Sequence, residues 1–145
     1  MSEELVIKVR RVYEEAYNKG NLDALNDLID ANYLRHQPPM KKVQGLAAFK
    51  AFITEVRAAY PNLDMVLDEV FSAGDKTVVR LTLKGKNSGK IPTLRTPPTD
   101  RDVAMPGCVI STWKNGKIIE EWVYNDYLGL AYQIGVMPII TGSFE

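Results

Sequence analysis

The chain has 145 residues, of which 46% are hydrophobic and 25% charged, a balance typical of one globular domain. Its 18 Lys and Arg side chains equal its 18 Asp and Glu side chains, so no basic surplus is available to neutralise nucleic-acid phosphates. No apolar run approaches the roughly 20 residues of a membrane span. A single Cys excludes an internal disulfide, and one Cys with one His is too few ligands for a typical structural metal site.

These counts predict a single soluble domain over residues 1–145, located in the cytoplasm, with neither nucleic acid nor membrane as partner. We expect no metal and no cofactor. A net charge of zero gives little repulsion between copies, so we also expect a homodimer or a higher homo-oligomer.

The N-terminal part of the chain has helical spacing of apolar residues. A first helix runs from Leu5 and is ended by Gly20. Asn21 is expected to cap a second short helix that extends to Ile29. The paired prolines in residues 33–39 are expected to break that helix.

A third helix begins near Gly45 and must end before Pro61, after which the pattern changes to that of strands. Apolar and polar residues alternate, and Asn115-Gly116 is a strong hairpin signal. The predicted strands cover residues 65–73, 77–86, 103–113 and 117–124, with a loop over 87–102 and a closing helix over 127–134.

Three helices followed by antiparallel strands predict an α+β fold in which helices cover the apolar face of a curved sheet. Aromatic side chains occur in the first and third helices and in the last strand. A sheet wrapped around such side chains favours an apolar pocket for a small molecule.

Several short motifs, in this order and spacing, resemble those of one family. They are Val9-Arg10-Arg11, Asn18-Lys19-Gly20-Asn21-Leu22, Gly45 to Phe49 leading into Val56-Arg57-Ala58-Ala59-Tyr60-Pro61, Pro97-Pro98-Thr99-Asp100-Arg101, Gly116-Lys117-Ile118, and Asp126 with Gly129 and Gln133-Ile134-Gly135. The chain resembles the SnoaL-like polyketide cyclases, which belong with ketosteroid isomerase and nuclear transport factor 2-like proteins to a cone-shaped, cystatin-like group. The resemblance implies a curved antiparallel sheet wrapped around three N-terminal helices.

The resemblance also implies a reaction. Such cyclases close a ring by intramolecular aldol condensation without metal or cofactor, and an aspartate removes the carbon-bound proton. An apolar pocket suits this chemistry because it raises a carboxyl pKa toward the working pH. The aspartate is expected six residues after Lys117, where this chain has Val123, and its histidine partner aligns with Val109. Because valine cannot transfer a proton, the family mechanism does not transfer directly.

Two carboxylates of the last strand remain as candidate acids or bases. Asp126 precedes the closing helix, so it is either a catalytic acid or an N-cap. Glu121 shares a strand face with Val123 in a regular strand, so it either faces the pocket or is solvated and paired with a basic residue. A bulge in the strand would instead turn Trp122 inward.

His36 is the third catalytic candidate, because a pocket histidine can orient a carbonyl or act as a base. The alternative is that it satisfies the irregular backbone beside the paired prolines. Cys108 is expected to be a small buried hydrophobic residue rather than a nucleophile. The residues expected to contact a substrate are Tyr17, Phe52, Val109, Trp122 and Val123.

Two functions follow from this sequence. The first is a cofactor-free cyclase, isomerase or related lyase that acts on an apolar carbonyl compound through Asp126 or Glu121 with His36. The second is a non-catalytic protein that binds an apolar small molecule in the same pocket, as the valines at positions 109 and 123 favour. The exposed sheet face is expected to serve for dimerisation in either case.

Overall fold

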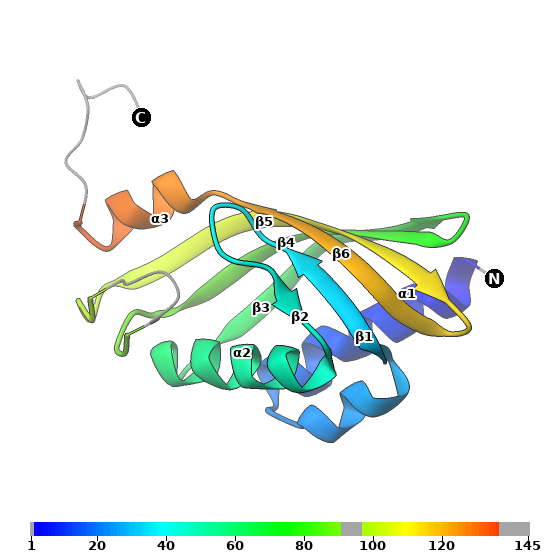
Figure 1. Cartoon of the computed structure of the whole chain (residues 1–145). Helices are drawn as coiled ribbons and strands as arrows, with labels where there is room; N and C mark the ends of the chain where they lie inside the picture. The colour runs from blue at the N-terminus through cyan, green and yellow to red at the C-terminus, as the bar shows by residue number, and fades with distance from the viewer. Residues whose placement is uncertain (1, 91–96, 137–145) are drawn as a thin grey trace.

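The computed structural model describes residues 2–90 and 97–136 (Figure 1). Within these residues a six-stranded sheet has the order β2-β1-β6-β5-β4-β3. The helices are α1 (Ser2–Arg11), the π-helix η1 (Val12–Asn18), the 3₁₀-helix η2 (Leu22–Asp27), α2 (Leu46–Ala59) and α3 (Tyr127–Gln133). The strands are β1 (Ile29–His36), β2 (Val43–Gln44), β3 (Asp64–Ala73), β4 (Lys76–Lys86), β5 (Asp102–Lys114) and β6 (Lys117–Asn125).

The helices cover one face of the curved sheet, as the sequence predicts. Figure 1 shows α1 and α2 on the same side of the strands, with α3 at the far end of β6. Strands β4 and β5 alternate buried and exposed residues along their length, and the buried set faces these helices. The α+β fold is therefore confirmed. The sheet is antiparallel apart from the pairing of β1 with β6, which is parallel.

The segment after the second helix differs from the prediction. The helical turn ends at Asp27, and residues 29–36 form strand β1 instead of a continued helix and an irregular break. The inward side chains of this strand are Tyr33 and Arg35, with Gln37 following just after its end. Because arginine and glutamine occupy inward positions, apolar and polar residues do not alternate here, and the pattern that would predict a strand is absent from the sequence.

The hairpin between β5 and β6 determines which residues of the last strand point inward. Asn115 and Gly116 both have positive φ, 52° and 78°, as a two-residue hairpin turn requires. The register of β6 shifts after Ile118, which leaves Ile119 as an extra residue in that strand. Beyond the shift, Glu121 is buried and Trp122 is exposed, so the bulge precedes Glu121 and does not turn Trp122 inward.

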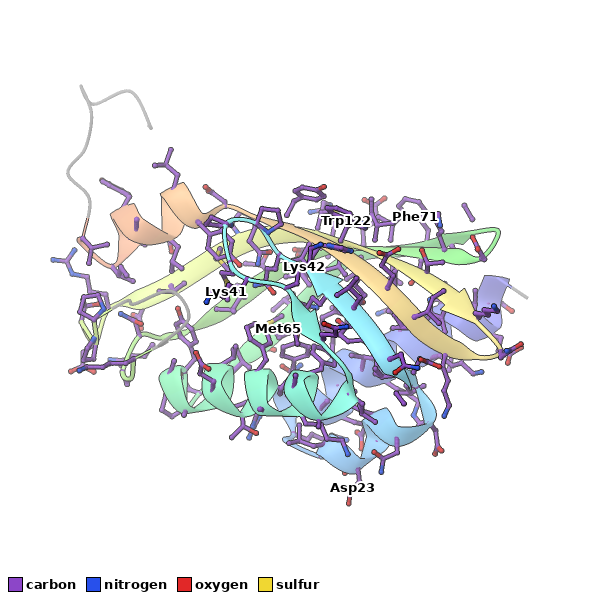
Figure 2. All side chains as sticks on the ribbon, in the orientation of Figure 1. Asp23, Lys41, Lys42, Met65, Phe71 and Trp122 are labelled. Atoms are coloured by element: carbon purple, nitrogen blue, oxygen red, sulfur yellow. The ribbon has the colours of Figure 1, made fainter. Side chains whose placement is uncertain are left out.

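The outer face of the sheet carries a row of four apolar side chains and one histidine, one from each of five strands. Cross-strand pairing aligns Phe71, Val78, Ile110, Trp122 and His36. Figure 2 shows Phe71 and Trp122 on the side of the sheet away from the helices. Both are largely exposed, as is Tyr124 beside them.

Among residues 2–90 and 97–136, no helix is long and apolar enough to cross a bilayer.

Candidate functional site

A buried ion pair connects the two parallel strands at the centre of the sheet. Arg35 of β1 is the register partner of Glu121 of β6. The Nη1 atom of Arg35 lies 3.0 Å from Oε1 of Glu121, and the side chains are only 6% and 2% exposed. Removing two charges from water costs several kcal/mol per ion, so such a pair persists only when further hydrogen bonds support it.

Two hydroxyl groups supply that support. Ser111, the register partner of Glu121 on β5, donates to Oε2, and Tyr33 donates to Oε1. Oε1 therefore accepts from both Tyr33 and Arg35, and Oε2 accepts from Ser111. Glu121 is therefore held in place by three hydrogen bonds from within the protein.

Aromatic rings enclose the other partner of the ion pair. The guanidinium carbon of Arg35 lies 5.4 Å from the ring centroids of both Phe49 and Phe52, a cation–π arrangement. Burial works to lower the pKa of Arg35, but the Glu121 carboxylate beside it helps to keep that pKa above the ordinary value. Arg35 is therefore a permanent cation whose charge is balanced by Glu121.

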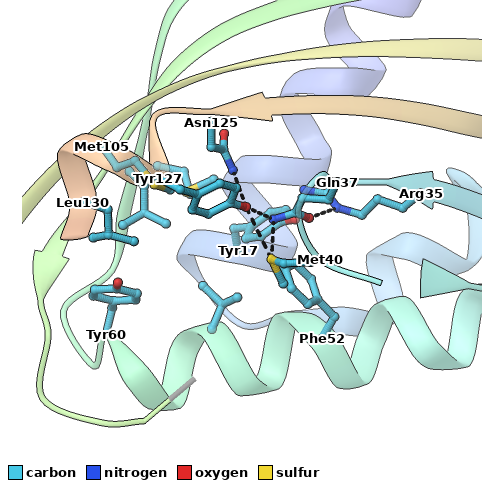
Figure 3. A pocket seen from close by; sticks show the side chains of 13 residues that line it. Tyr17, Arg35, Gln37, Met40, Phe52, Tyr60, Met105, Asn125, Tyr127 and Leu130 are labelled. Carbon is cyan, nitrogen blue, oxygen red and sulfur yellow. Dashed lines mark hydrogen bonds between the residues drawn. The ribbon is translucent and has the colours of Figure 1, made fainter. Parts of the chain in front are cut away.

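An apolar cavity lies beside this ion pair, between the sheet, α2 and α3 (Figure 3). Its volume is about 40 Å³, which is room for a few waters. A larger ligand must displace side chains, and three methionines in the wall are flexible enough to move. The wall consists of Tyr17, Arg35, Gln37, Met40, Phe52, Val56, Tyr60, Met65, Leu83, Met105, Asn125, Tyr127 and Leu130.

Tyr17 brings a hydrogen-bond donor into this cavity without a protein partner. It lies in the π-helical turn η1, stacked on Tyr13 with ring centroids 5.3 Å apart. The end of that turn is fixed by Arg57, whose Nη1 donates to the carbonyl oxygen of Tyr17 at 2.6 Å. The side chain is 2% exposed, and its hydroxyl has no hydrogen-bond partner. Burial raises the pKa of Tyr17 to about 12, so the phenol keeps its proton at neutral pH.

A second polar group lies at the α3 side of the cavity. The hydroxyl of Tyr127 accepts from Nε2 of Gln37 at 2.5 Å and from Nδ2 of Asn125 at 3.1 Å. It also lies 3.4 Å from the sulfur of Met40. Figure 3 shows these contacts as a chain that runs from Arg35 through Gln37 to Tyr127.

The three residues predicted from the sequence as catalytic all lie outside the described cavity wall. Asp126 is exposed, and its carboxylate accepts the backbone N–H of Gly129 at 2.8 Å, as an N-cap does. Glu121 is buried behind Arg35. His36 is on the outer face, where its ring stacks on that of Trp122 with centroids 3.8 Å apart. Its Nε2 atom lies 2.8 Å from Oε2 of Glu120, within hydrogen-bond distance. Their catalytic roles stay predictions, and each would need an access to substrate that this wall does not give.

The residues predicted to bind substrate are divided among three places. Tyr17 and Phe52 line the cavity. Val109 and Val123 face each other as register partners on β5 and β6 and are about 1% exposed in the core, outside the described cavity wall. Trp122 is 41% exposed on the outer face.

Several residues of the site were missed from the sequence. They are Tyr33, Arg35, Gln37, Met40, Ser111, Asn125 and Tyr127. One signal was available: Tyr33, Arg35 and Gln37 are spaced two apart, which places them on one face of a strand. A buried Glu121 also requires a basic partner.

No metal site is formed in residues 2–90 and 97–136, because His, Cys, Asp and Glu side chains nowhere cluster in threes there. The polar groups of the described cavity wall are phenols, amides and one guanidinium. They can donate hydrogen bonds to oxygen atoms of a ligand, and none is a carboxylate.

Removing one member of the ion pair should strongly destabilise the protein. Glu121→Gln leaves Arg35 buried without a counter-charge, so we expect the free energy of unfolding in urea to fall by about 3–5 kcal/mol. The double substitution Arg35→Met/Glu121→Leu should recover most of that loss, because it removes both charges. Glu69→Gln is the control: it breaks the exposed pair with Arg80 and should change stability by less than about 1 kcal/mol. Equal losses for Glu121→Gln and Glu69→Gln would contradict the assignment.

Comparison with known proteins agrees with this fold. The family model described as SnoaL-like polyketide cyclase matches residues 7–134. A candidate SnoaL-like polyketide cyclase from Jannaschia sp. CCS1 is 25% identical, with 94% of this chain and 95% of that chain covered and a TM-score of 0.83. TsrD from Streptomyces laurentii is 27% identical, with 90% and 97% covered and a TM-score of 0.79. No curated protein matches the chain. The family match spans most of the sequence, and the chain therefore belongs to the SnoaL-like polyketide cyclase family.

Proposed function

We propose that the protein binds a small apolar molecule with a carbonyl group in the cavity beside Arg35. The observation that carries this proposal is the hydroxyl of Tyr17, which is buried, protonated at neutral pH and without a partner in an otherwise largely apolar wall. An unsatisfied buried donor costs about 1–3 kcal/mol, and a ligand oxygen that accepts from it removes this cost.

Family membership supports the same class of ligand. IdmH from Streptomyces antibioticus, named as a candidate polyketide cyclase, shares the fold with a TM-score of 0.74 at 24% identity. The wall differs from an acid–base site in one respect: among the described residues it contains no carboxylate and no histidine. Binding is therefore the function that this geometry supports best.

Binding is tested with an aromatic ketone and a hydrocarbon of similar shape. We expect 2-acetylnaphthalene to raise the melting temperature of the protein by mass action, and at 100 times its Kd to add about 2.7 kcal/mol of stability. Tyr17→Phe should lower the affinity for the ketone about tenfold, since one hydrogen bond is lost. The same substitution should leave 2-isopropylnaphthalene unchanged. Failure of both compounds to bind the wild-type protein would contradict the proposal.

A second candidate function is a cofactor-free cyclase, isomerase or lyase, and family membership is the observation that favours it. In that function Asp126, Glu121 or His36 would remove or return a proton at a carbon next to a carbonyl. Tyr17 and Arg35 would stabilise the enolate oxygen by hydrogen bonding.

Deuterium exchange next to a carbonyl tests this second function. Purified protein should accelerate exchange in at least one of 2-tetralone, acetophenone and ethyl acetoacetate, measured by proton NMR. Asp126→Asn is a clean probe, because asparagine also caps helices and stability should be kept. A fall of about 100-fold or more in that variant or in His36→Gln, with unchanged unfolding, would identify the acid or base. If the wild type exchanges none of the three ketones, the catalytic function is rejected.

We also propose that two copies associate through the outer face of the sheet. The exposed row of Phe71, Ile110 and Trp122 is apolar, and Arg80 beside it pairs with Glu69 on the same face. Apolar side chains flanked by both signs of charge suit an interface in which the same patch meets itself.

Light scattering after size-exclusion chromatography should give twice the chain mass of 16.3 kDa. Ile110→Lys should halve that mass, because it places a charge in the centre of the row. Ile7→Lys is the matched control, since Ile7 is 62% exposed on α1. A wild-type protein that elutes as a monomer at 100 µM would exclude this interface.

The expected cytoplasmic location and the single domain over residues 1–145 likewise stand as proposals.

A further inference from the structure

The hydroxyl of Tyr127 has a fixed direction of hydrogen bonding. Its oxygen accepts from Gln37 and from Asn125, and a phenol oxygen has two lone pairs, so both are used. Its own proton is therefore the group that remains for a further hydrogen bond. The acceptor in the structure is the sulfur of Met40 at 3.4 Å, and a thioether is a weak acceptor.

The buried ion pair sets this direction. Nε of Arg35 donates to Oε1 of Gln37 at 2.7 Å. Arginine has no acceptor, so the Gln37 amide must turn its oxygen toward Arg35 and its NH₂ group toward Tyr127. Glu121 in turn holds Arg35 through the contact of 3.0 Å. Glu121 thus positions Arg35, Arg35 orients the amide of Gln37, and that amide donates to the hydroxyl of Tyr127.

Two phenol protons on the ion-pair side of the cavity thus lack a strong acceptor, one on Tyr17 and one on Tyr127. We propose that the site recognises an uncharged molecule by two acceptor oxygens, one bound by Tyr17 and the other taking the Tyr127 proton from Met40. This inference rests on the proposed binding function and specifies its ligand as a diketone, keto-ester or similar neutral compound.

The charge balance of the site explains why the ligand is uncharged. Arg35 is neutralised by Glu121, so a ligand carboxylate would bring an uncompensated negative charge into a mostly apolar cavity. Two neutral carbonyl oxygens satisfy both phenols without that cost.

Matched ligands with two, one and no acceptor oxygens test this inference by isothermal titration calorimetry. The compounds are 1,3- and 1,4-diacetylbenzene, 3- and 4-ethylacetophenone, 1,3- and 1,4-diethylbenzene, and the anions 3- and 4-acetylbenzoate. For at least one of the two geometries, each added carbonyl should tighten binding about fivefold. The acetylbenzoates should bind at least tenfold more weakly than the diacetylbenzene of the same geometry.

Variants then separate the two donors. Tyr17→Phe and Tyr127→Phe should each lower the affinity for the diacetylbenzene about fivefold and leave diethylbenzene unchanged. Gln37→Glu should act like Tyr127→Phe, because a carboxylate beside Tyr127 accepts its proton. A merely structural role of Gln37 would instead weaken all ligands equally.

The outcomes distinguish this inference from the proposed function. If mono- and diketones bind equally in the wild type, or if an acetylbenzoate binds best, the cavity still binds ligands but the two-acceptor inference is wrong. If Tyr127→Phe or Gln37→Glu lowers the affinity for the diketone and for the hydrocarbon equally, the two-acceptor inference is wrong as well. If no compound of the series binds, both this inference and the proposed function are overturned.

Discussion

The ion pair between Arg35 and Glu121 is the constraint on which the rest of the site depends. Two charges can remain this deeply buried only with complementary hydrogen bonds, and those bonds involve β1, β5 and β6 at once. The parallel pairing of β1 with β6 places the two residues in register. The same pair then orients Gln37, so the electrostatics of the core determine the hydrogen-bond donors that the cavity offers.

This arrangement bears on how the valines at positions 109 and 123 are interpreted. They are paired across β5 and β6, where the family resemblance places a histidine and an aspartate. In this chain the next inward pair of the same strands, Ser111 and Glu121, is polar. The polar pair therefore lies two residues away, on each strand, from the position expected of a proton-transfer pair. At this position the carboxylate of Glu121 is paired with Arg35. A carboxylate held in this way stabilises the core and orients its neighbours, and Glu121 would need contact with the substrate to transfer a proton.

Elements with a clear period could be predicted from the sequence, and those without one could not. The α2 helix, the strands from β3 to β6 and the Asn115-Gly116 turn follow from apolar spacing and turn chemistry. Strand β1 was missed because its inward positions hold Tyr33 and Arg35, whose burial depends on partners far away in the chain. Gln37 and Met40 follow this strand, so the cavity was expected but several of its polar contacts were not.

The fixed direction of hydrogen bonding also bears on how a cavity of about 40 Å³ can serve as a binding site. Arg35 and Gln37 are held by the ion pair of the sheet, whereas the apolar part of the wall includes Met40, Met65 and Met105, which can change rotamer at small cost. A ligand can therefore enlarge the space without disturbing the donors that recognise it. Rigid donors and adaptable apolar walls together favour selection by the placement of oxygen atoms over selection by exact shape.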